Sequence, residues 1–173
     1  AIARDFLEKE CPKSLVRQME EDERGYSAEL WRKMAELGWL GLPFPPKYGG
    51  SGKSFLDLVI LLEEMGRVLF PSPFVSTVVC SGLPILWAGT EEQKEEFLPR
   101  IAKGELILTL ALTEPNARYD VEGIKVSATP DGDNFIINGA KLFIPYANVA
   151  DYLLCVTRTS TRKNKGKPIT LFL

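Results

Sequence analysis

Apolar residues recur every three or four positions through the first hundred residues, a spacing that gathers them on one face of a helix. One such segment begins at Ser27, a residue type that caps helix N-termini, and ends at Gly38. Thr90 and Gln93 form a capping-box pattern at the start of another segment, which Gly104 ends. The pattern predicts helices over residues 8–23 with a new start at Pro12, and over 27–38, 54–66, 73–87 and 90–104.

The same spacing predicts which side of each helix faces the core. Segment 73–87 is apolar nearly all round, which is typical of a helix buried on most sides. Residues 39–52 contain three prolines and four glycines and predict a long ordered loop. In segment 54–66 the expected inward residues are Phe55, Leu58, Val59, Leu62 and Met65.

The pattern changes after Gly104 to short apolar runs separated by turn residues. Asp131-Gly132 and Asn138-Gly139 are pairs that favour type I′ hairpin turns. Helices followed by hairpins predict an α+β protein of two domains, an all-helical domain over 1–104 and an antiparallel β domain over 105–173. The predicted strands cover residues 106–112, 123–129, 134–138, 141–144, 151–157 and 169–173.

Composition excludes several classes of protein. The 173 residues are 45% hydrophobic and 25% charged with a net charge of −2, which fits a globular core and no general nucleic-acid surface. We expect no membrane span and no signal peptide, because no run approaches about 20 apolar residues and the start is not basic. The chain begins without methionine and stops within a predicted strand, so we expect it to belong to a longer protein.

The absence of histidine excludes the usual zinc ligand sets and the Ser-His-Asp triad, and we expect no metal. Three widely spaced cysteines, Cys11, Cys80 and Cys155, form no disulfide framework and favour a reduced, cytoplasmic compartment. The basic run 162–167 is typical of a solvated hairpin loop, and a contact to a phosphorylated ligand or partner is the alternative.

Two further patterns resemble sites. Gly49 to Ser54 ends in Gly-Lys-Ser, but Lys47 and the preceding prolines exclude a phosphate-binding loop, which leaves a tight structural turn. The paired carboxylates on the helices indicate solvated faces rather than a general acid or base. For Glu114, between Thr113 and Pro115, we expect an N-cap-like or turn hydrogen bond.

Two segments could form binding sites. The strand 106–112 ends on Thr113 and is stopped by Pro115, so its backbone groups and the threonine hydroxyl can pair with a flat heterocycle. Small residues on helix 73–87 either let another helix approach or leave a slot for a thin apolar ligand. These small residues are Ser76, Thr77, Cys80 and Ser81.

These motifs, in this order, resemble the acyl-CoA dehydrogenase family over the whole chain. The segments similar to its N-terminal domain are Gly38–Leu42, Pro46, Gly49–Gly52, Glu63–Arg67, Gly89–Lys94, Leu98–Pro99 and Gly104–Glu105. The segments similar to its β domain are Ala111–Pro115, Asp120 and Asn138–Lys141.

The resemblance implies an all-α N-terminal domain, a middle β-barrel that this chain holds incompletely, and a C-terminal four-helix domain that it lacks. It implies oxidation of an acyl-CoA thioester to its α,β-enoyl form, with FAD as cofactor, electron-transfer flavoprotein as acceptor and a homo- or hetero-oligomer as the assembly. The base would lie in or beside the C-terminal domain, so we expect no catalytic residue here. The implied FAD contacts are Leu110, Leu112, Thr113, Phe143, Ile144 and Pro145, and the expected substrate contacts are Ser76, Thr77, Cys80 and Tyr119.

Three positions depart from the family pattern. Tyr119 replaces a serine near the flavin phosphates and the CoA, and Phe143 replaces a frequent tryptophan. Pro145 replaces a threonine whose hydroxyl and N–H face flavin N5, and proline offers neither group. The departures keep two alternatives open: a non-catalytic, flavin-poor subunit or binding protein, and a flavin oxidase or monooxygenase on the same fold.

Overall fold

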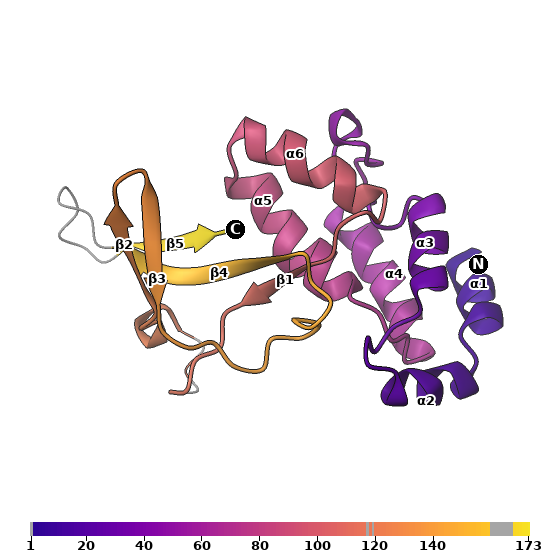
Figure 1. Cartoon of the computed structure of the whole chain (residues 1–173). Coiled ribbons are helices and arrows are strands. Elements are labelled where there is room, and N and C mark those ends of the chain that lie inside the picture. Colours follow the sequence, from indigo (N-terminus) through magenta and orange to yellow (C-terminus); the bar gives the residue numbers. More distant parts are fainter. Residues whose placement is uncertain (1, 117, 119, 160–167) are drawn as a thin grey trace.

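The computed structural model describes residues 2–116, 118, 120–159 and 168–173. Helices gather at one end of the molecule and strands at the other (Figure 1). The basic run 162–167 and Tyr119 lie outside the described residues. The helices are α1 Ile2–Glu10, α2 Lys13–Glu21, α3 Ala28–Glu36, the 3₁₀-helix η1 Pro46–Tyr48, α4 Phe55–Arg67, the π-helix η2 Val75–Gly82, α5 Leu83–Ala88, α6 Glu91–Ala102 and the 3₁₀-helix η3 Val121–Gly123. The strands are β1 Leu108–Ala111, β2 Ser127–Asp131, β3 Asn134–Asn138, β4 Tyr152–Thr159 and β5 Ile169–Phe172.

The predicted helix starts at Ser27, Ser54 and Thr90 are confirmed by their caps, whereas the first predicted helix, over 8–23, is wrong at its start because α1 already begins at Ile2. The Ser27 hydroxyl accepts a hydrogen bond from the third residue of its helix, and Ser54 and Thr90 each form a full capping box. The stop at Gly104 is also confirmed, because this residue has the left-handed φ of +73° that a glycine adopts most easily. Short-range side-chain chemistry therefore sets where these helices begin and end.

Two expectations about buried faces are wrong. Leu58, Leu61 and Met65 are the inward residues of α4, whereas Phe55 is 57% and Val59 is 41% exposed. Residues 55–62 are apolar except at position 57, so the pattern does not select one face. The segment 73–87 is divided into the π-helix η2 and the short helix α5, and Trp87 at its end is 70% exposed.

The sheet is mixed rather than purely antiparallel. β2 pairs with β3 and β4 with β5 in antiparallel fashion, whereas β1 and β2 both run parallel to β4. The hairpin at Asp131-Gly132 is present, and Asp131 pairs with Asn134, so its two loop residues are Gly132 and Asp133. Only Gly132 has a positive φ, whereas a type I′ turn needs a positive φ at both loop residues, so the turn is not of the expected type. Residues 141–144 form no strand; the Leu142 N–H instead bonds to the Thr113 carbonyl oxygen.

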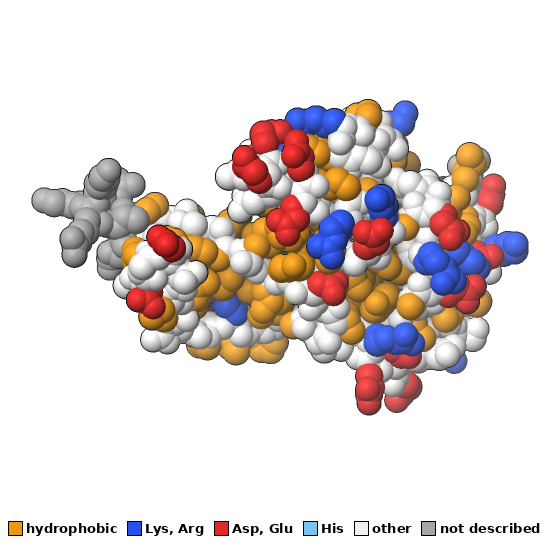
Figure 2. Space-filling model, turned by 45° about the horizontal axis from the view of Figure 1, so that its top comes forward, with side chains coloured by type: hydrophobic (Ala, Val, Ile, Leu, Met, Phe, Trp, Pro, Cys, Tyr) orange, Lys and Arg blue, Asp and Glu red, His pale blue; other side chains and the backbone are white. Residues whose placement is uncertain are grey.

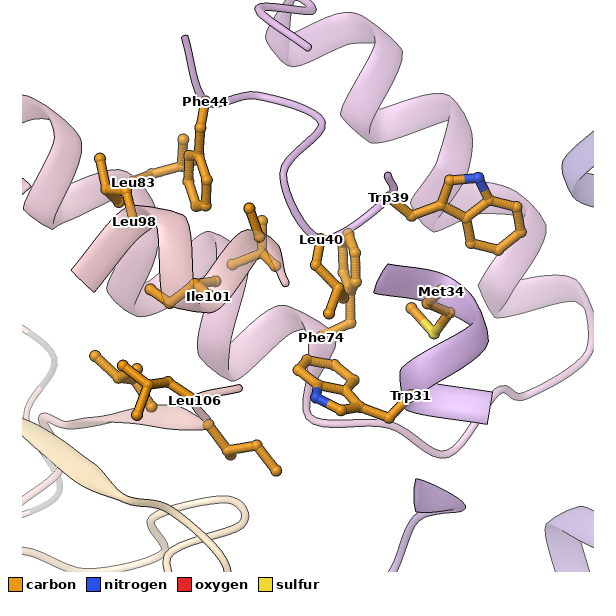
Figure 3. Packing of buried hydrophobic residues seen from close by; sticks show 14 of the residues in the cluster. Trp31, Met34, Trp39, Leu40, Phe44, Phe74, Leu83, Leu98, Ile101 and Leu106 are labelled. Carbon is orange, nitrogen blue, oxygen red and sulfur yellow. The ribbon is translucent and has the colours of Figure 1, made fainter. Parts of the chain in front are cut away.

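The core lies mainly among the helices and in the loop 39–52. Phe44 from this loop is fully buried and packs beside Leu83 and Leu98, while Leu40 and Phe74 fill the neighbouring space (Figure 3). Leu106 and Leu108 carry the same cluster into the β part, so the helices and β1 share one core. This shared core fixes the position of β1.

The surface of the helical part carries both signs of charge. Acidic and basic side chains are interspersed over the helical part of the face in view (Figure 2). Among the described residues, no helix has the length and hydropathy needed to cross a membrane.

Glu91 connects the loop 39–52 to α6 and gives a pH prediction. Its carboxylate accepts hydrogen bonds from Lys94, Lys47 and the Tyr48 hydroxyl, which lower its pKa to about 2. Because the folded pKa lies below the unfolded one, the contribution to stability is present above about pH 4.5 and is lost as the pH falls toward 2. We expect the thermal midpoints of wild type and Glu91→Gln to converge over this range, and parallel curves would contradict the assignment.

Candidate functional site

The outer edge of β1 is the centre of the candidate site. Among the described strands, β1 has β4 as its one neighbour, and the Ile107 carbonyl faces that neighbour by accepting from the Asp151 N–H. Backbone groups of successive strand residues point to opposite edges. The N–H and C=O groups of Leu108, Leu110 and Leu112 are therefore directed away from β4.

Two side chains occupy this outer edge on either side of Leu110. On the N-terminal side of Leu110, the Thr77 hydroxyl accepts from the Leu108 N–H at 3.2 Å and donates to the Leu108 carbonyl at 3.0 Å. On the C-terminal side of Leu110, Lys141 Nζ donates to the Leu112 carbonyl at 3.1 Å. Leu110 lies between them and offers one donor and one acceptor at the open part of the edge.

The segment 141–146 approaches the same strand from its side. The Leu142 N–H bonds to the Thr113 carbonyl at 2.9 Å, and the Thr109 hydroxyl bonds to the Pro145 carbonyl at 2.7 Å. These two contacts bring the predicted residues 143–145 beside the predicted residues 110–113. Their role in binding a cofactor stays a prediction.

This segment carries unusual backbone and an exposed ring. Phe143 and Tyr146 have backbone φ values of +52° and +58°. Residues other than glycine adopt such values at a cost of about 1–3 kcal/mol. The Phe143 ring is 88% exposed. Strained backbone beside an open strand edge is typical of a binding site.

Of the predicted substrate contacts on η2, Thr77 is the one whose side chain hydrogen-bonds to this edge. Thr77 is fully buried and its hydroxyl is used by β1, while the Ser81 hydroxyl donates to the Ser76 carbonyl. Cys80 is half-buried, and burial raises the pKa of its thiol. For Thr77 and Ser81 the close-packing alternative therefore describes the structure. A cavity of about 220 Å³ lies between α4 and the start of η2. It is lined by Leu62, Met65, Gly66, Leu69, Phe70, Ser72, Phe74 and Val75.

Glu114 and Lys141 are the residues that sequence reasoning missed as a pair. Lys141 Nζ lies 2.7 Å from Glu114 Oε1, and both side chains are buried. Glu114 also accepts backbone hydrogen bonds from Lys125 and Val126, which lie 11 and 12 residues further along the chain, so these long-range bonds and the ion pair stand in place of the expected local hydrogen bond. Each residue belonged to a motif, but nothing in the spacing indicated that they meet.

Thr77 gives a test of how β1 is held. Thr77→Val keeps the shape of the side chain but leaves the buried Leu108 N–H without its hydroxyl partner, which costs about 1–3 kcal/mol. The free energy of unfolding in urea measures this loss. Thr129→Val on the exposed face of β2 is the matched control and is expected to stay within about 0.5 kcal/mol of wild type. Equal effects at the two positions would contradict the role of Thr77.

Two family models match this arrangement of helices and sheet. The model described as acyl-CoA dehydrogenase, N-terminal domain, matches residues 1–105, and the model for the middle domain of the same family matches residues 109–173. The chain therefore belongs to the acyl-CoA dehydrogenase family, as its resemblance predicted.

Individual relatives agree with this assignment. The short-chain specific acyl-CoA dehydrogenase of Clostridium acetobutylicum is 37% identical over 169 residues, which cover 95% of this chain and 44% of the relative. Subunit CarC of the caffeyl-CoA reductase-Etf complex of Acetobacterium woodii is 37% identical over 164 residues, which cover 94% of this chain and 43% of the relative. The chain thus spans less than half the length of these curated relatives.

A solved structure gives the same fold. The acyl-CoA dehydrogenase of Bacillus anthracis complexed with FAD superimposes with a TM-score of 0.83 at 29% identity. The match covers 99% of this chain and 29% of that one. The similarity extends across both the helical part and the sheet.

Proposed function

We propose that the full-length protein is an FAD-dependent acyl-CoA dehydrogenase that converts an acyl-CoA thioester to its α,β-enoyl form. The observation that carries this proposal is the open stretch of the β1 edge at Leu110, bounded by Thr77 and Lys141. Membership of the family and the FAD in the Bacillus anthracis relative support the choice of cofactor.

The residues of the open edge fit the pyrimidine side of a flavin. That side of the ring has alternating carbonyl and N–H groups, which complement a backbone donor and acceptor such as those of Leu110. The Thr113 hydroxyl adds a group that can donate or accept beside them, and donors at this edge favour the negative charge that develops there on reduction. The bound cofactor would supply the acceptor for the hydride.

The segment 143–145 would cover the ring from its side. The exposed Phe143 ring offers an apolar surface against which an aromatic system can pack. Pro145 has no N–H, and its carbonyl is held by Thr109, so this position offers no hydrogen bond toward flavin N5. We infer that this protein binds FAD through fewer hydrogen bonds than relatives with threonine at that position.

The base and the partners complete the proposal. Glu114 is the carboxylate nearest in sequence to the edge, and Lys141 and two backbone N–H groups occupy it. We therefore infer that Glu114 is not the base. The resemblance to the family implies a base outside residues 1–173, and we propose on that ground that these residues alone turn over no acyl-CoA. We also propose a helical domain 1–104, a middle domain 105–173, an electron-transfer flavoprotein as acceptor, oligomer formation and a cytoplasmic location. The Etf-complex relative supports the acceptor.

Anaerobic titration of the full-length protein with acyl-CoA thioesters of graded chain length tests the reaction. We expect at least one thioester to bleach the visible absorbance of the flavin, since α,β-dehydrogenation reduces the flavin. A protein that binds FAD but is not bleached by any thioester would contradict the proposed reaction. Rapid reaction of the reduced flavin with oxygen would favour the oxidase or monooxygenase instead.

Pro145 favours one second candidate, a non-catalytic subunit on the same fold. A full-length protein that stays colourless in excess FAD would support this candidate. In that case Tyr119→Ser combined with Pro145→Thr is expected to restore the flavin absorbance, because the two substitutions return the family's residues to these positions.

A further inference from the structure

Glu114 and Lys141 form the most buried ion pair between described residues. The side chains are 4% and 7% exposed, with Nζ and Oε1 2.7 Å apart. Burial by itself would raise the pKa of Glu114, but hydrogen bonds from Lys141 and from the Lys125 and Val126 N–H groups outweigh it and hold the pKa below its ordinary value. The carboxylate is therefore ionised at neutral pH and attracts the ammonium group.

The pair connects three segments that share no strand ladder at this point. Glu114 accepts from Lys125 at 2.8 Å and from Val126 at 3.1 Å, immediately before β2. Lys141, which follows β3, donates to the Leu112 carbonyl at 3.1 Å. One ion pair thus anchors the end of β1 to both neighbouring segments.

The ion pair anchors Leu112 and Thr113, two residues that have no backbone pairing with β4. The pairing of β1 with β4 ends at Ala111, so it does not fix Leu112 and Thr113. The remaining backbone contacts at this end are the Lys141 bond to Leu112 and the Leu142 bond to Thr113. Both contacts come from adjacent residues of one segment, and the ion pair holds that segment in place.

We propose that Glu114 and Lys141 are positioning residues whose ion pair sets the geometry of the flavin-binding edge. This inference rests on the proposed function, because it assigns the pair to the cofactor that the edge would hold. Buried ion pairs add little net stability compared with apolar pairs of the same size, but they fix one arrangement where their partners are also hydrogen-bonded. The pair therefore affects FAD affinity more than a pair of equal strength elsewhere in the fold.

Lys141→Met in the full-length protein tests the proposal, with Lys33→Met as the matched control. Lys33 forms ion pairs with Glu10 at 2.6 Å and with Glu29 at 3.0 Å within the helical part, so the same substitution breaks ion pairs remote from β1. Quenching of FAD fluorescence gives the dissociation constant, and amide hydrogen exchange of the FAD-free protein reports the edge itself.

We expect Lys141→Met to raise the FAD dissociation constant at least about tenfold and to speed amide exchange at Leu112 and Thr113. Lys33→Met is expected to leave both quantities within about twofold of wild type. Lys141→Arg keeps the charge and is expected to recover part of the affinity. Equal FAD affinity in Lys141→Met and wild type would overturn the inference, as would an equal loss in Lys33→Met.

A neutral double variant, Glu114→Gln with Lys141→Met, removes both charges and leaves no buried charge unpaired. If the single variant does not fold, this double variant tests whether the ion pair affects FAD affinity. We expect it to fold and still bind FAD more weakly than wild type, whereas wild-type affinity in this variant would overturn the inference. A wild-type protein that binds no FAD would overturn the proposed function and this inference together. Wild-type binding with unaffected variants would overturn the inference alone.

Discussion

Gly50→Ala is expected to destabilise the protein by about 3 kcal/mol or more. A Cβ atom at this position would lie under 3.0 Å from the backbone carbonyl oxygens of Phe44 and Gly41. Those oxygens accept hydrogen bonds from the Gly52 and Ser51 N–H groups, so they cannot move without breaking the loop. The free energy of unfolding in urea measures the loss.

Gly66→Ala is the matched control for this substitution. Gly66 lies in α4, and an added Cβ would meet no atom within 4 Å. Alanine favours a helix over glycine, so the control is expected to raise the free energy of unfolding by about 0.5–1 kcal/mol. Similar losses at the two glycines would contradict the packing of the loop against its own backbone.

Phe44→Ala is expected to cost about 3–5 kcal/mol, because it removes a fully buried ring from the centre of the core. The ring packs against Gly82, where a Cβ would come 2.6 Å from the Phe44 Cζ atom. Leu83 and Leu98 lie together beside it (Figure 3). The expected cost includes the cavity that alanine would leave, because a packed core relaxes only partially around such a deletion.

Phe55→Ala makes the same chemical change at an outward position of α4. Phe55 is 57% exposed, and its replacement is expected to change the free energy of unfolding by no more than about 0.5 kcal/mol. A loss as large as that of Phe44→Ala would show that Phe55 faces the core, as the helical pattern alone predicted.

Local chemistry made much of the helical part predictable. Ser27, Ser54 and Thr90 cap helices through contacts within three residues, and such short-range contacts are visible in the sequence. The inward face of α4 was not predictable, because its first two turns are apolar on nearly every side. The π-helix was equally hidden, since its i→i+5 bonds have no residue signature in this apolar run.

In the β part, the strand positions were more predictable than their pairing. Alternation and turn residues identify strands, but the parallel pairing of β1 with β4 joins segments about forty residues apart. The end of β1 was recognised as a candidate site because Thr113 and Pro115 stop the strand. The contacts that shape the site, from Lys141 to Glu114 and from Thr109 to Pro145, depend on chain folding over distance and on positive φ at Phe143 and Tyr146.

A structure of the full-length protein with FAD would test the central claim most directly, through the distance from the Leu110 backbone nitrogen to the flavin. We predict that this nitrogen and the Leu110 carbonyl oxygen lie about 2.7–3.2 Å from polar atoms of the pyrimidine edge, with the Phe143 ring beside the isoalloxazine. A flavin bound elsewhere, or a Leu110 backbone paired with another strand of the protein, would contradict the account.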